Sequence, residues 1–367
     1  MARALMLSLL CLVTLASPAR AGDECDTDSL YPVDIAGKWG YIDRTGQVVI
    51  EPRFNRADYF SEGLAAVVVG YGDSERYGCI DKTGKLVIEV KYGCVRPFSE
   101  GLAAVLIGEW RAGSWGYVDK TGKMRIPAQF ADADSFSEGL AVVGVSDESS
   151  TRYTYIDRDG KQAIERQFGH AGSFREGLAG VVRCDEEWQA GYINRAGDYV
   201  ISGLRVQPED FSEGLAWYES ADRSEGYIDT HGRTAIRAGF AYGQPFSEGL
   251  ASVCTEHGKH GFIDKTGEFI IEARFDRAEG FSEGLAVVKI FNPDASYTIK
   301  PGANMPTRPG DYGFIDKTGK LVIEPQFYEA ESFCGGLARV WITADSDSGG
   351  KFSYIDKTGK IIWKAQE

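Results

Sequence analysis

Short runs of apolar and β-branched residues, separated by turn residues, recur along nearly the whole chain. Residues 39–43 and 48–51 are two such runs, and they flank Arg44-Thr45-Gly46. No sustained 3.6-residue period accompanies the runs, so the pattern predicts β-hairpins and almost no helix. The common period is 35 to 38 residues, and the units begin at Gly40, Gly78, Gly116, Thr154, Gly191, Gly226, Gly261, Gly313 and Ser353. Such periodicity predicts a repeat protein.

The turn of each hairpin has a clear chemical logic. The Asp43 carboxylate can accept hydrogen bonds from backbone amides two residues on, and Gly46 supplies the positive φ that closes a type I turn with a bulge. The same turn recurs at residues 81–84 and 316–319. A less regular stretch, residues 52–61, then leads to a third strand that begins at Gly63. We therefore predict units of three antiparallel strands.

A second phrase, Phe-Ser-Glu-Gly-Leu-Ala or a near copy, occurs eight times. Large apolar residues at the repeat period usually build the core, so Phe60, Trp39 and Trp115 are expected to be structural. Gly46 and Gly63 are expected to be turn residues. Three aromatic ladders are predicted: Tyr41, Tyr117, Tyr155, Tyr192, Tyr227, Phe262, Phe314 and Tyr354; Phe54, Phe130, Phe168, Phe275 and Phe327; and Phe60, Phe98, Phe136, Phe174, Phe211, Phe246, Phe281 and Phe333.

One acidic residue per unit stands in the same phrase, at Glu62, Glu100, Glu138, Glu176, Glu213, Glu248 and Glu283. A calcium ladder or a row of catalytic carboxylates is one interpretation, but the dense Asp-Gly ligands of calcium-binding repeats are absent. We instead expect Glu62 and its equivalents to be structural hydrogen-bond acceptors. Gly335 replaces the acid in the last full unit.

The first 21 residues have the pattern of a secretory signal peptide. Arg3 is a small positive n-region, residues 4–16 are apolar, and Ala19-Arg20-Ala21 is a small-x-small cleavage site. We therefore expect an exported protein, periplasmic or extracellular, without membrane insertion. Removing residues 1–21 deletes two arginines and no acid, so the formal charge moves from −14 to −16. Such an acidic chain is not expected to bind nucleic acid.

Six cysteines remain after residue 21, an even number that suits an oxidising compartment: Cys25, Cys79, Cys94, Cys184, Cys254 and Cys334. They allow 15 pairings, which the sequence does not distinguish. A bond between Cys79 and Cys94, which lie within one unit, is the first expectation.

The short segments that match catalytic motifs are explained by the repeat or lack the rest of their motif. Lys-Thr-Gly, one element of the penicillin-binding signature, occurs five times as a hairpin turn, and Ser348-Gly349-Gly350-Lys351 lies in a polar loop without the S-D-N element. His257 and His260 have no evident third partner for a metal, so we interpret them as surface residues. There is no P-loop, H-E-x-x-H or G-x-S-x-G. We expect no enzyme activity, no metal and no cofactor.

Length variation falls almost entirely between the third strand of one unit and the next hairpin. The largest case is an insert at residues 291–311 with four prolines. Length changes confined to one edge are how repeat proteins display a binding surface. The candidate binding residues on this edge are Trp110, Trp188, Tyr218, Tyr297, Asp185 and Glu186. Aromatic platforms with flanking acids suit glycan stacking or a basic peptide, but plain solvated connections are the alternative.

The two phrases together resemble those of the bacterial WG repeat, also called the KWG repeat. The first phrase reads Trp-Gly-Tyr-Ile-Asp-Lys-Thr-Gly-Lys-Leu-Val-Ile-Glu-Pro-x-Phe in consensus, and the similarity extends from about Lys38 to Trp363. Tryptophan itself survives only at Trp39 and Trp115. The resemblance implies a secreted or envelope β-repeat protein with a binding role, and it supplies no catalytic residues.

The predicted organisation is a signal peptide at 1–21, an N-terminal lead-in at 22–37 and a repeat array at 38–367. The array has about eight full repeats and a C-terminal half repeat, because nine hairpins accompany only eight Gly-Leu-Ala strands. We favour an all-β open stack, solenoid-like, of three-stranded antiparallel units with the surplus hairpin as a cap. An eight-bladed β-propeller is the alternative.

The predicted function is a secreted or periplasmic, non-catalytic binding scaffold. It would recognise a protein or glycan through the loops between repeats, as a monomer. A structural envelope component without a specific ligand is the first alternative, and a hydrolase that uses loop carboxylates is the second.

Overall fold

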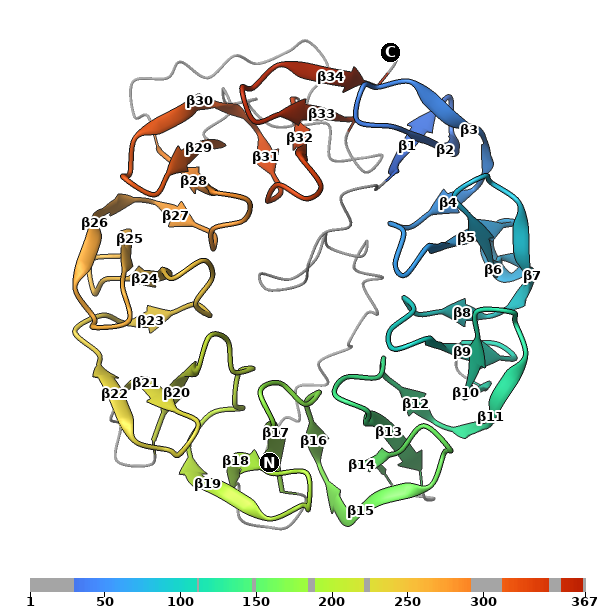
Figure 1. Ribbon diagram of the computed structural model, residues 1–367, viewed down its shortest axis with the longest axis horizontal. Coiled ribbons are helices and arrows are strands. Elements are labelled where there is room, and N and C mark those ends of the chain that lie inside the picture. The colour runs from blue at the N-terminus through green and yellow to red at the C-terminus, as the bar shows by residue number, and fades with distance from the viewer. Residues whose placement is uncertain are drawn as a thin grey trace, which may run out of the picture.

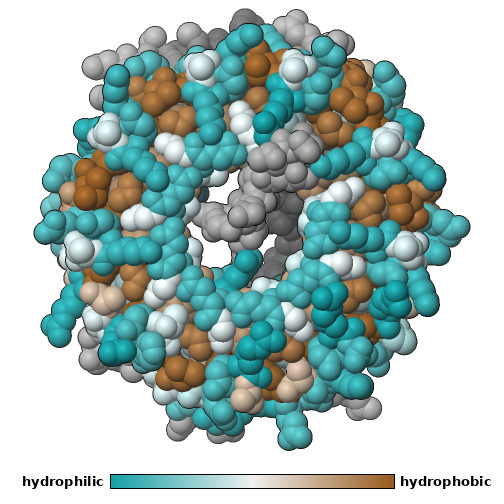
Figure 2. All heavy atoms as spheres, viewed as in Figure 1, coloured by the Kyte–Doolittle hydropathy of each residue, from teal (hydrophilic) through white to brown (hydrophobic). Residues whose placement is uncertain are grey.

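Nine small antiparallel sheets stand around a central axis and form a nine-bladed β-propeller (Figure 1). The computed structural model describes residues 30–110, 112–146, 150–183, 189–220, 225–291, 312–342 and 351–365. The expected signal peptide and residues 292–311 of the expected insert lie outside these ranges. The described side chains surround a central opening (Figure 2).

Seven blades have four strands, and blades 1 and 6 have three within the described ranges. One 3₁₀ turn, η1 (Gly72–Ser74), lies in blade 2. The strands of blades 1 to 3 are β1 (Tyr31–Ile35), β2 (Lys38–Ile42), β3 (Val48–Phe54); β4 (Arg56–Ala57), β5 (Leu64–Val69), β6 (Arg76–Asp81), β7 (Leu86–Tyr92); and β8 (Cys94–Val95), β9 (Leu102–Ile107), β10 (Ser114–Asp119), β11 (Met124–Phe130). Those of blades 4 to 6 are β12 (Asp132–Ala133), β13 (Ala141–Ser146), β14 (Thr151–Ile156), β15 (Gln162–Phe168); β16 (His170–Ala171), β17 (Ala179–Val182), β18 (Ala190–Ile193), β19 (Tyr199–Leu204); and β20 (Leu215–Glu219), β21 (Glu225–Asp229), β22 (Thr234–Arg237). Those of blades 7 to 9 are β23 (Tyr242–Gly243), β24 (Ala251–Cys254), β25 (His260–Ile263), β26 (Phe269–Phe275); β27 (Arg277–Ala278), β28 (Leu285–Lys289), β29 (Tyr312–Asp316), β30 (Leu321–Phe327); and β31 (Glu329–Ala330), β32 (Leu337–Trp341), β33 (Phe352–Asp356), β34 (Ile361–Lys364).

Each four-stranded blade consists of a two-residue inner strand, a second strand that begins at Leu-Ala or just after the leucine, a third strand and an outer strand. In blade 2 these are β4, β5, β6 and β7, and neighbouring strands are antiparallel. The predicted unit therefore has the wrong boundary. The strand that starts at Leu64 pairs with β6, which belongs to the next sequence unit, and not with the preceding hairpin. The stretch predicted to be irregular, residues 52–61, contains the end of β3 and all of β4.

The predicted hairpin turn between the third and outer strands is confirmed. In blade 1 the Asp43 carboxylate accepts hydrogen bonds from the backbone amides of Thr45 and Gln47, at 2.8 and 3.0 Å. Gly46 has φ +85° and donates its amide to the Asp43 carbonyl. A glycine is favoured here because an L side chain is strained at this φ.

The glycine of the Trp-Gly step is required by a close approach between the third and outer strands. A Cβ at Gly40 would lie 2.4 Å from the Ile50 carbonyl oxygen, because β3 bulges at this point. In blade 4 the equivalent residue is Thr154, and its hydroxyl donates a 2.7 Å hydrogen bond to the corresponding carbonyl of Ile164. At Thr154 a hydrogen bond thus replaces the clash.

The predicted open stack is wrong, because nine hydrophobic clusters occupy all nine junctions between neighbouring blades. One of them joins Tyr31, Val33 and Ile42 of blade 1 to Leu337, Phe352 and Tyr354 of blade 9. The alternative prediction, an eight-bladed β-propeller, had the right architecture but one blade too few. The ninth second strand is β1, which pairs with β2 of the first hairpin. It lies inside the expected lead-in and lacks the Gly-Leu-Ala phrase. The C-terminal hairpin, β33 and β34, completes blade 9 and is not a cap.

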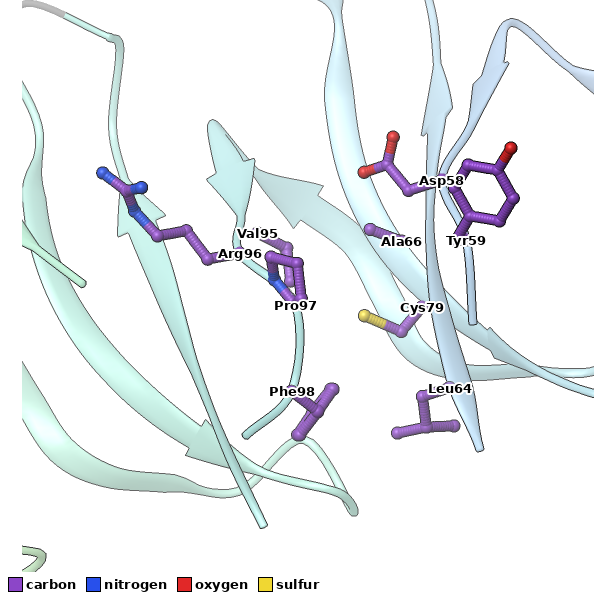
Figure 3. Close-up of a pocket in the computed structure, with 9 residues that line it drawn as sticks. All are labelled: Asp58, Tyr59, Leu64, Ala66, Cys79, Val95, Arg96, Pro97 and Phe98. Carbon is purple, nitrogen blue, oxygen red and sulfur yellow. The ribbon is translucent and has the colours of Figure 1, made fainter. Parts of the chain in front are cut away.

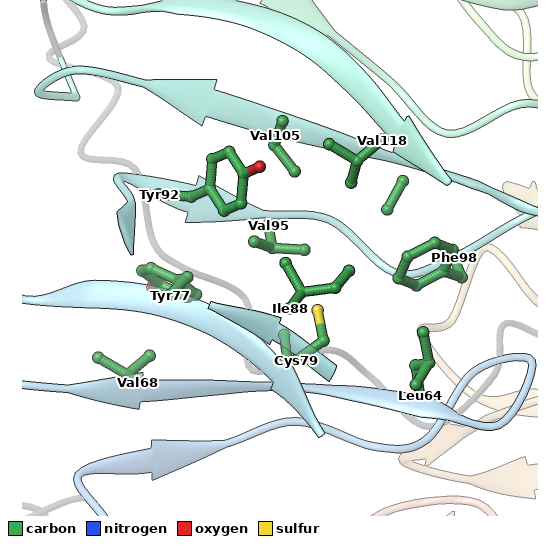
Figure 4. Close-up of a cluster of buried hydrophobic side chains, with 12 residues drawn as sticks. Leu64, Val68, Tyr77, Cys79, Ile88, Tyr92, Val95, Phe98, Val105 and Val118 are labelled. Carbon is green, nitrogen blue, oxygen red and sulfur yellow. The ribbon is translucent and has the colours of Figure 1, made fainter. Parts of the chain in front are cut away.

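The aromatic ladders pack between blades as predicted. The Tyr41 ring of blade 1 lies 4.9 Å from the Phe60 ring of blade 2, and its hydroxyl donates a 2.7 Å bond to the Asp58 carbonyl. The junction between blades 2 and 3 shows the same layer of apolar side chains from two sheets (Figure 4). Equivalent ring pairs are Tyr117–Phe136, Tyr155–Phe174, Tyr192–Phe211, Tyr227–Phe246, Phe262–Phe281 and Phe314–Phe333.

The expected bond between Cys79 and Cys94 is wrong. Cys79 is a buried free thiol. Cys334 takes part in a disulfide. It occupies the serine position of the repeated phrase in blade 9, where the glutamate is also replaced, by Gly335.

Candidate functional site

The strand order gives the ring two different faces. Because neighbouring strands are antiparallel, the inner-to-second and third-to-outer turns emerge on one side, which we call the turn face. The second-to-third loops and the connections to the next blade emerge on the other side, which we call the loop face. The predicted edge that carries the length variation is the loop face.

The turn face is held together by a hydrogen-bonded clasp between neighbouring blades. The Glu138 carboxylate of blade 4 accepts the backbone amide of Gly177 in blade 5, at 3.0 and 3.2 Å. The Ser137 hydroxyl donates to the Phe174 carbonyl, at 2.7 Å. The same carboxylate-to-amide contact joins Glu62 to Gly101, Glu100 to Gly139, Glu176 to Gly214, Glu213 to Gly249, Glu248 to Gly284 and Glu283 to Gly336. The expectation that these glutamates are structural acceptors is confirmed.

Backbone strain shows how much the clasp depends on this side chain. Glu138 has φ +53°, and all seven glutamates adopt this left-handed conformation, which costs an L residue about 1 kcal/mol. In four blades a turn lysine adds an ion pair, such as Lys120 to Glu62 at 3.0 Å. The polar groups of the clasp are therefore already engaged in structural contacts.

Exposed large apolar side chains fall into two groups. Of the large hydrophobic side chains that are exposed within the described ranges, one group lies at the start of outer strands, on the rim of the ring. The other group lies on the loop face: Val69, Tyr71, Ile107, Trp110, Val145, Val206, Tyr242, Phe291, Tyr328 and Ile342. The loop face thus offers apolar contact area of its own, in addition to that at the rim.

The blade 2 loop presents Tyr71 on a well-ordered support. Tyr71 is 69% exposed and directly precedes η1. Its backbone amide donates a hydrogen bond to the Ser74 hydroxyl, and that hydroxyl donates one to the Tyr71 carbonyl. The Arg76 guanidinium donates to the carbonyls of Asp73 and Glu75. The Lys38 ammonium lies 5.3 Å from the centre of the Tyr71 ring. The ring is therefore held at the surface and already contacts one cation.

The blade 3 loop presents Trp110 in a similar way. Trp110 is 50% exposed, and its ring meets the buried Trp115 edge-on at 6.1 Å. The Arg96 guanidinium lies over the Trp115 ring at 5.2 Å. The Gly113 amide closes the loop on the Glu109 carbonyl, at 2.7 Å. The loop is thus anchored from below.

Only part of the predicted binding set lies on this surface. Trp110 is exposed as expected, whereas Tyr218 is buried and its hydroxyl lies 3.0 Å from that of Thr234, so it offers little to a ligand. Trp188, Tyr297, Asp185 and Glu186 lie outside the described residues. Tyr71 was missed by the sequence analysis, although an aromatic residue between two glycines in a variable loop is a usable signal.

A small pocket lies between blades 2 and 3 (Figure 3). Cys79 occupies the position held by tyrosine in the blades on either side, and the space that the phenol ring would fill is left between Ala66, Val95 and Phe98. Burial raises the pKa of the Asp58 carboxyl at its edge to about 6, and burial raises the pKa of the Cys79 thiol to about 12. The space is of the order of one water molecule, so it is not a substrate-sized cavity.

Within the described ranges, no group of three or more His, Cys, Asp and Glu side chains is placed to hold a metal ion. Likewise, no helix in the described part of the chain is long and apolar enough to cross a membrane.

Structural comparison supports the fold. A crystal structure described as the eukaryotic initiation factor superimposes with a TM-score of 0.59 at 11% identity, over 91% of this chain and 95% of that one. BamB from Moraxella catarrhalis gives a TM-score of 0.41 at 12% identity, over 89% and 96%. The WD40 β-propeller domain of Doa1 gives 0.30 at 12% identity, over 74% and 93%. At 11% identity the likeness to the first of these structures shows the fold alone.

Sequence comparison finds a family match that follows the blades. No curated protein matches the chain. The model described as "WG containing repeat" matches seven segments, which together cover more than half of the chain: residues 39–71, 77–109, 115–147, 153–188, 226–259, 261–290 and 312–340. The first three segments begin at Trp39, Tyr77 and Trp115, on the third strands of blades 1, 2 and 3.

Proposed function

Because this chain belongs to the WG containing repeat family and folds as a closed ring, we propose that it is an exported, non-catalytic scaffold that binds a protein partner through its loop face. One observation carries the proposal. The loop face carries exposed aromatic side chains, Tyr71 and Trp110 among them, while the polar groups of the turn face are engaged in the interblade clasp. Partly exposed apolar and aromatic residues are what protein interfaces bury.

Capture from an envelope extract tests this function. The parent, a loop-face variant (Tyr71→Ala with Trp110→Ala) and a rim variant (Val322→Ala) would be immobilised, and specifically retained proteins would be identified by mass spectrometry. We expect a defined protein to be retained by the parent and the rim variant and lost by the loop-face variant. Retention that is lost only in the rim variant would contradict the proposal.

Two rival functions predict other results. A structural component without a specific ligand predicts no specific retention by any form. A glycan-binding protein predicts retention on a glycan array that is lost in the loop-face variant. Export is checked separately by N-terminal sequencing of the protein from the envelope or the medium, where the expected first residue is Gly22.

A further inference from the structure

Apolar exposure on the loop face differs from blade to blade. The fifth residue after the leucine of the second strand is Val69 in blade 2, Ile107 in blade 3 and Val145 in blade 4, each more than 40% exposed. The same position is polar in blades 5, 6 and 7 and apolar in blades 8, 9 and 1, where it holds Ile290, Ile342 and Ile35. The apolar surface therefore belongs to particular blades and is not a property of every repeat.

In blades 2 and 3 this apolar surface coincides with two exposed aromatic side chains, Tyr71 and Trp110. We call Val69, Tyr71, Ile107 and Trp110, together with the loop carboxylates of Asp73, Glu75 and Glu109, the blade 2–3 patch. The two loops start alike, since Gly70 and Gly108 both have φ +100°. At Gly70 a Cβ would lie 2.4 Å from the Ser74 carbonyl oxygen, so this loop keeps its shape only with glycine.

The charge of the patch specifies what it would bind. In the described part of the chain, the carboxylates of Asp73, Glu75 and Glu109 have no ion-pair partner, and Asp73 and Glu109 are exposed. The Arg76 guanidinium donates hydrogen bonds to backbone carbonyls, and the Lys38 ammonium lies over the Tyr71 ring. Aromatic rings beside unpaired carboxylates favour a ligand that carries both positive charge and apolar side chains.

We propose that the blade 2–3 patch binds a cationic, apolar segment of a protein partner, in which Lys or Arg alternates with aliphatic residues. The aliphatic side chains pack on Val69, Ile107 and the rings, and the cations pair with the carboxylates. This proposal rests on the function proposed above and names the chemistry of its partner. The net charge of −14 adds a long-range attraction for such a segment.

The probe is a short synthetic peptide of alternating Lys and Leu, compared with Glu-Leu and Lys-Ser peptides of the same length by isothermal titration calorimetry. We expect binding of Lys-Leu only, weakened about tenfold or more in Tyr71→Ala/Trp110→Ala and in Asp73→Asn/Glu109→Gln. Added salt should weaken the parent more than the second variant. The matched control is Tyr328→Ala, an exposed aromatic on the loop face of blade 9, which should bind as the parent does.

Equal binding of the Glu-Leu peptide, or unchanged binding by both patch variants, would overturn the proposal.

The capture experiment distinguishes a failure of the patch proposal from a failure of the proposed loop-face function. If Tyr328→Ala loses the captured protein while the patch variants keep it, the loop face binds elsewhere and only the patch is wrong. If no loop-face variant changes capture, the proposed function fails as well. Thermal unfolding midpoints equal to that of the parent show that the variants are folded, because the altered side chains are exposed.

Discussion

The hydroxyl groups of Tyr59 and Tyr354 lie 3.1 Å apart, although 295 positions separate the residues in the sequence. Tyr59 follows the inner strand of blade 2, and Tyr354 lies on the third strand of blade 9. Blade 1, between them, has no inner strand within the described ranges, and Tyr59 packs against the apolar cluster that joins blades 9 and 1. Tyr354 also donates to the Pro32 carbonyl of blade 1, at 3.1 Å. In the described part of the chain no β-ladder joins blade 9 to blade 1, so these contacts help to close the ring.

Breaking the ion pair at this seam should be costly. Arg339 is 3% exposed, pairs with Glu331 and lies over the Trp341 and Phe352 rings. Arg339→Met leaves Glu331 charged and unpaired, so we expect the free energy of unfolding to fall by about 3–5 kcal/mol, measured by urea denaturation. Arg339→Met with Glu331→Gln should lose less, because no unpaired charge remains. A neutral effect of the single change would contradict this account.

A methyl group at Gly46 should cost more than the same group at Gly122. The two glycines have φ +85° and +81°, so each change to alanine costs about 1 kcal/mol from backbone strain. Only at Gly46 does the new Cβ meet a backbone oxygen, that of Ile362 in blade 9 at 2.3 Å, whereas at Gly122 it lies 3.4 Å from the Ile88 side chain. Thermal denaturation should rank Gly46→Ala clearly below Gly122→Ala, and equal midpoints would argue against a tight seam.

The clasp predicts a graded loss at Glu138. Glu138→Ala removes the acceptor of the Gly177 amide, and we expect it to destabilise the protein by about 1–2 kcal/mol. Glu138→Gln keeps an amide oxygen in reach and should lose less. The control is Glu165→Ala on the exposed side of β15, which should be near neutral in the same chemical denaturation series. If Ala and Gln behave alike at position 138, the hydrogen bond is not the stabilising contact.

The thiol of Cys79 should be inert in the folded protein. Burial raises its pKa to about 12, so almost no thiolate is present at pH 8, and the side chain is 1% exposed. Alkylation at Cys79, followed by peptide mass spectrometry, should rise only with unfolding in urea. The half-buried free thiol Cys254 is the comparison and should be modified earlier. Modification of Cys79 at the same rate as Cys254 in native buffer would show that the blade 2–3 junction opens.

Asp58 should make stability depend on pH in a defined window. Its pKa is 3.8 without perturbation and about 6 in the folded protein, because burial disfavours the charged form. A raised folded pKa means that its contribution to stability is fully present below about pH 4 and is lost as the pH rises through 6. Asp58→Asn should therefore flatten the change in unfolding free energy between pH 4.5 and 7.5. The exposed Asp159→Asn is the control for losing one carboxylate, and an unaltered pH profile in Asp58→Asn would contradict the assignment.

Local features of the fold could be predicted from the sequence because their chemistry is local. Asp43 and Gly46 specify a turn within four residues, and the ring pair of Tyr41 and Phe60 follows from large apolar residues at the repeat period. Ring closure depends on contacts between the two ends of the array, which no short motif records. The strand Tyr31–Ile35 completes blade 1 by pairing with β2. It shares with most other second strands a leucine and a valine three residues later, Leu30 and Val33, but it lacks the Gly-Leu-Ala phrase.

The candidate site was predictable only in outline. The position of Trp110 in a variable loop identified it as exposed. The same reasoning failed for Tyr218, because it lies near the end of β20 and its side chain is buried. The unpaired state of Asp73 and Glu109 is a property of their surroundings in space. It therefore became visible only with the structure.

Each blade is a continuous stretch of chain, and among the described residues no strand is shared between the first blade and the last. Duplication of the gene segment for one repeat would therefore add one whole blade, and deletion would remove one. Neither change would alter how the strands of the first and last blades are connected. The number nine is then fixed by the angles at which side chains pack between blades, and not by the topology. Propellers of this kind can change size during evolution by unequal recombination between repeats.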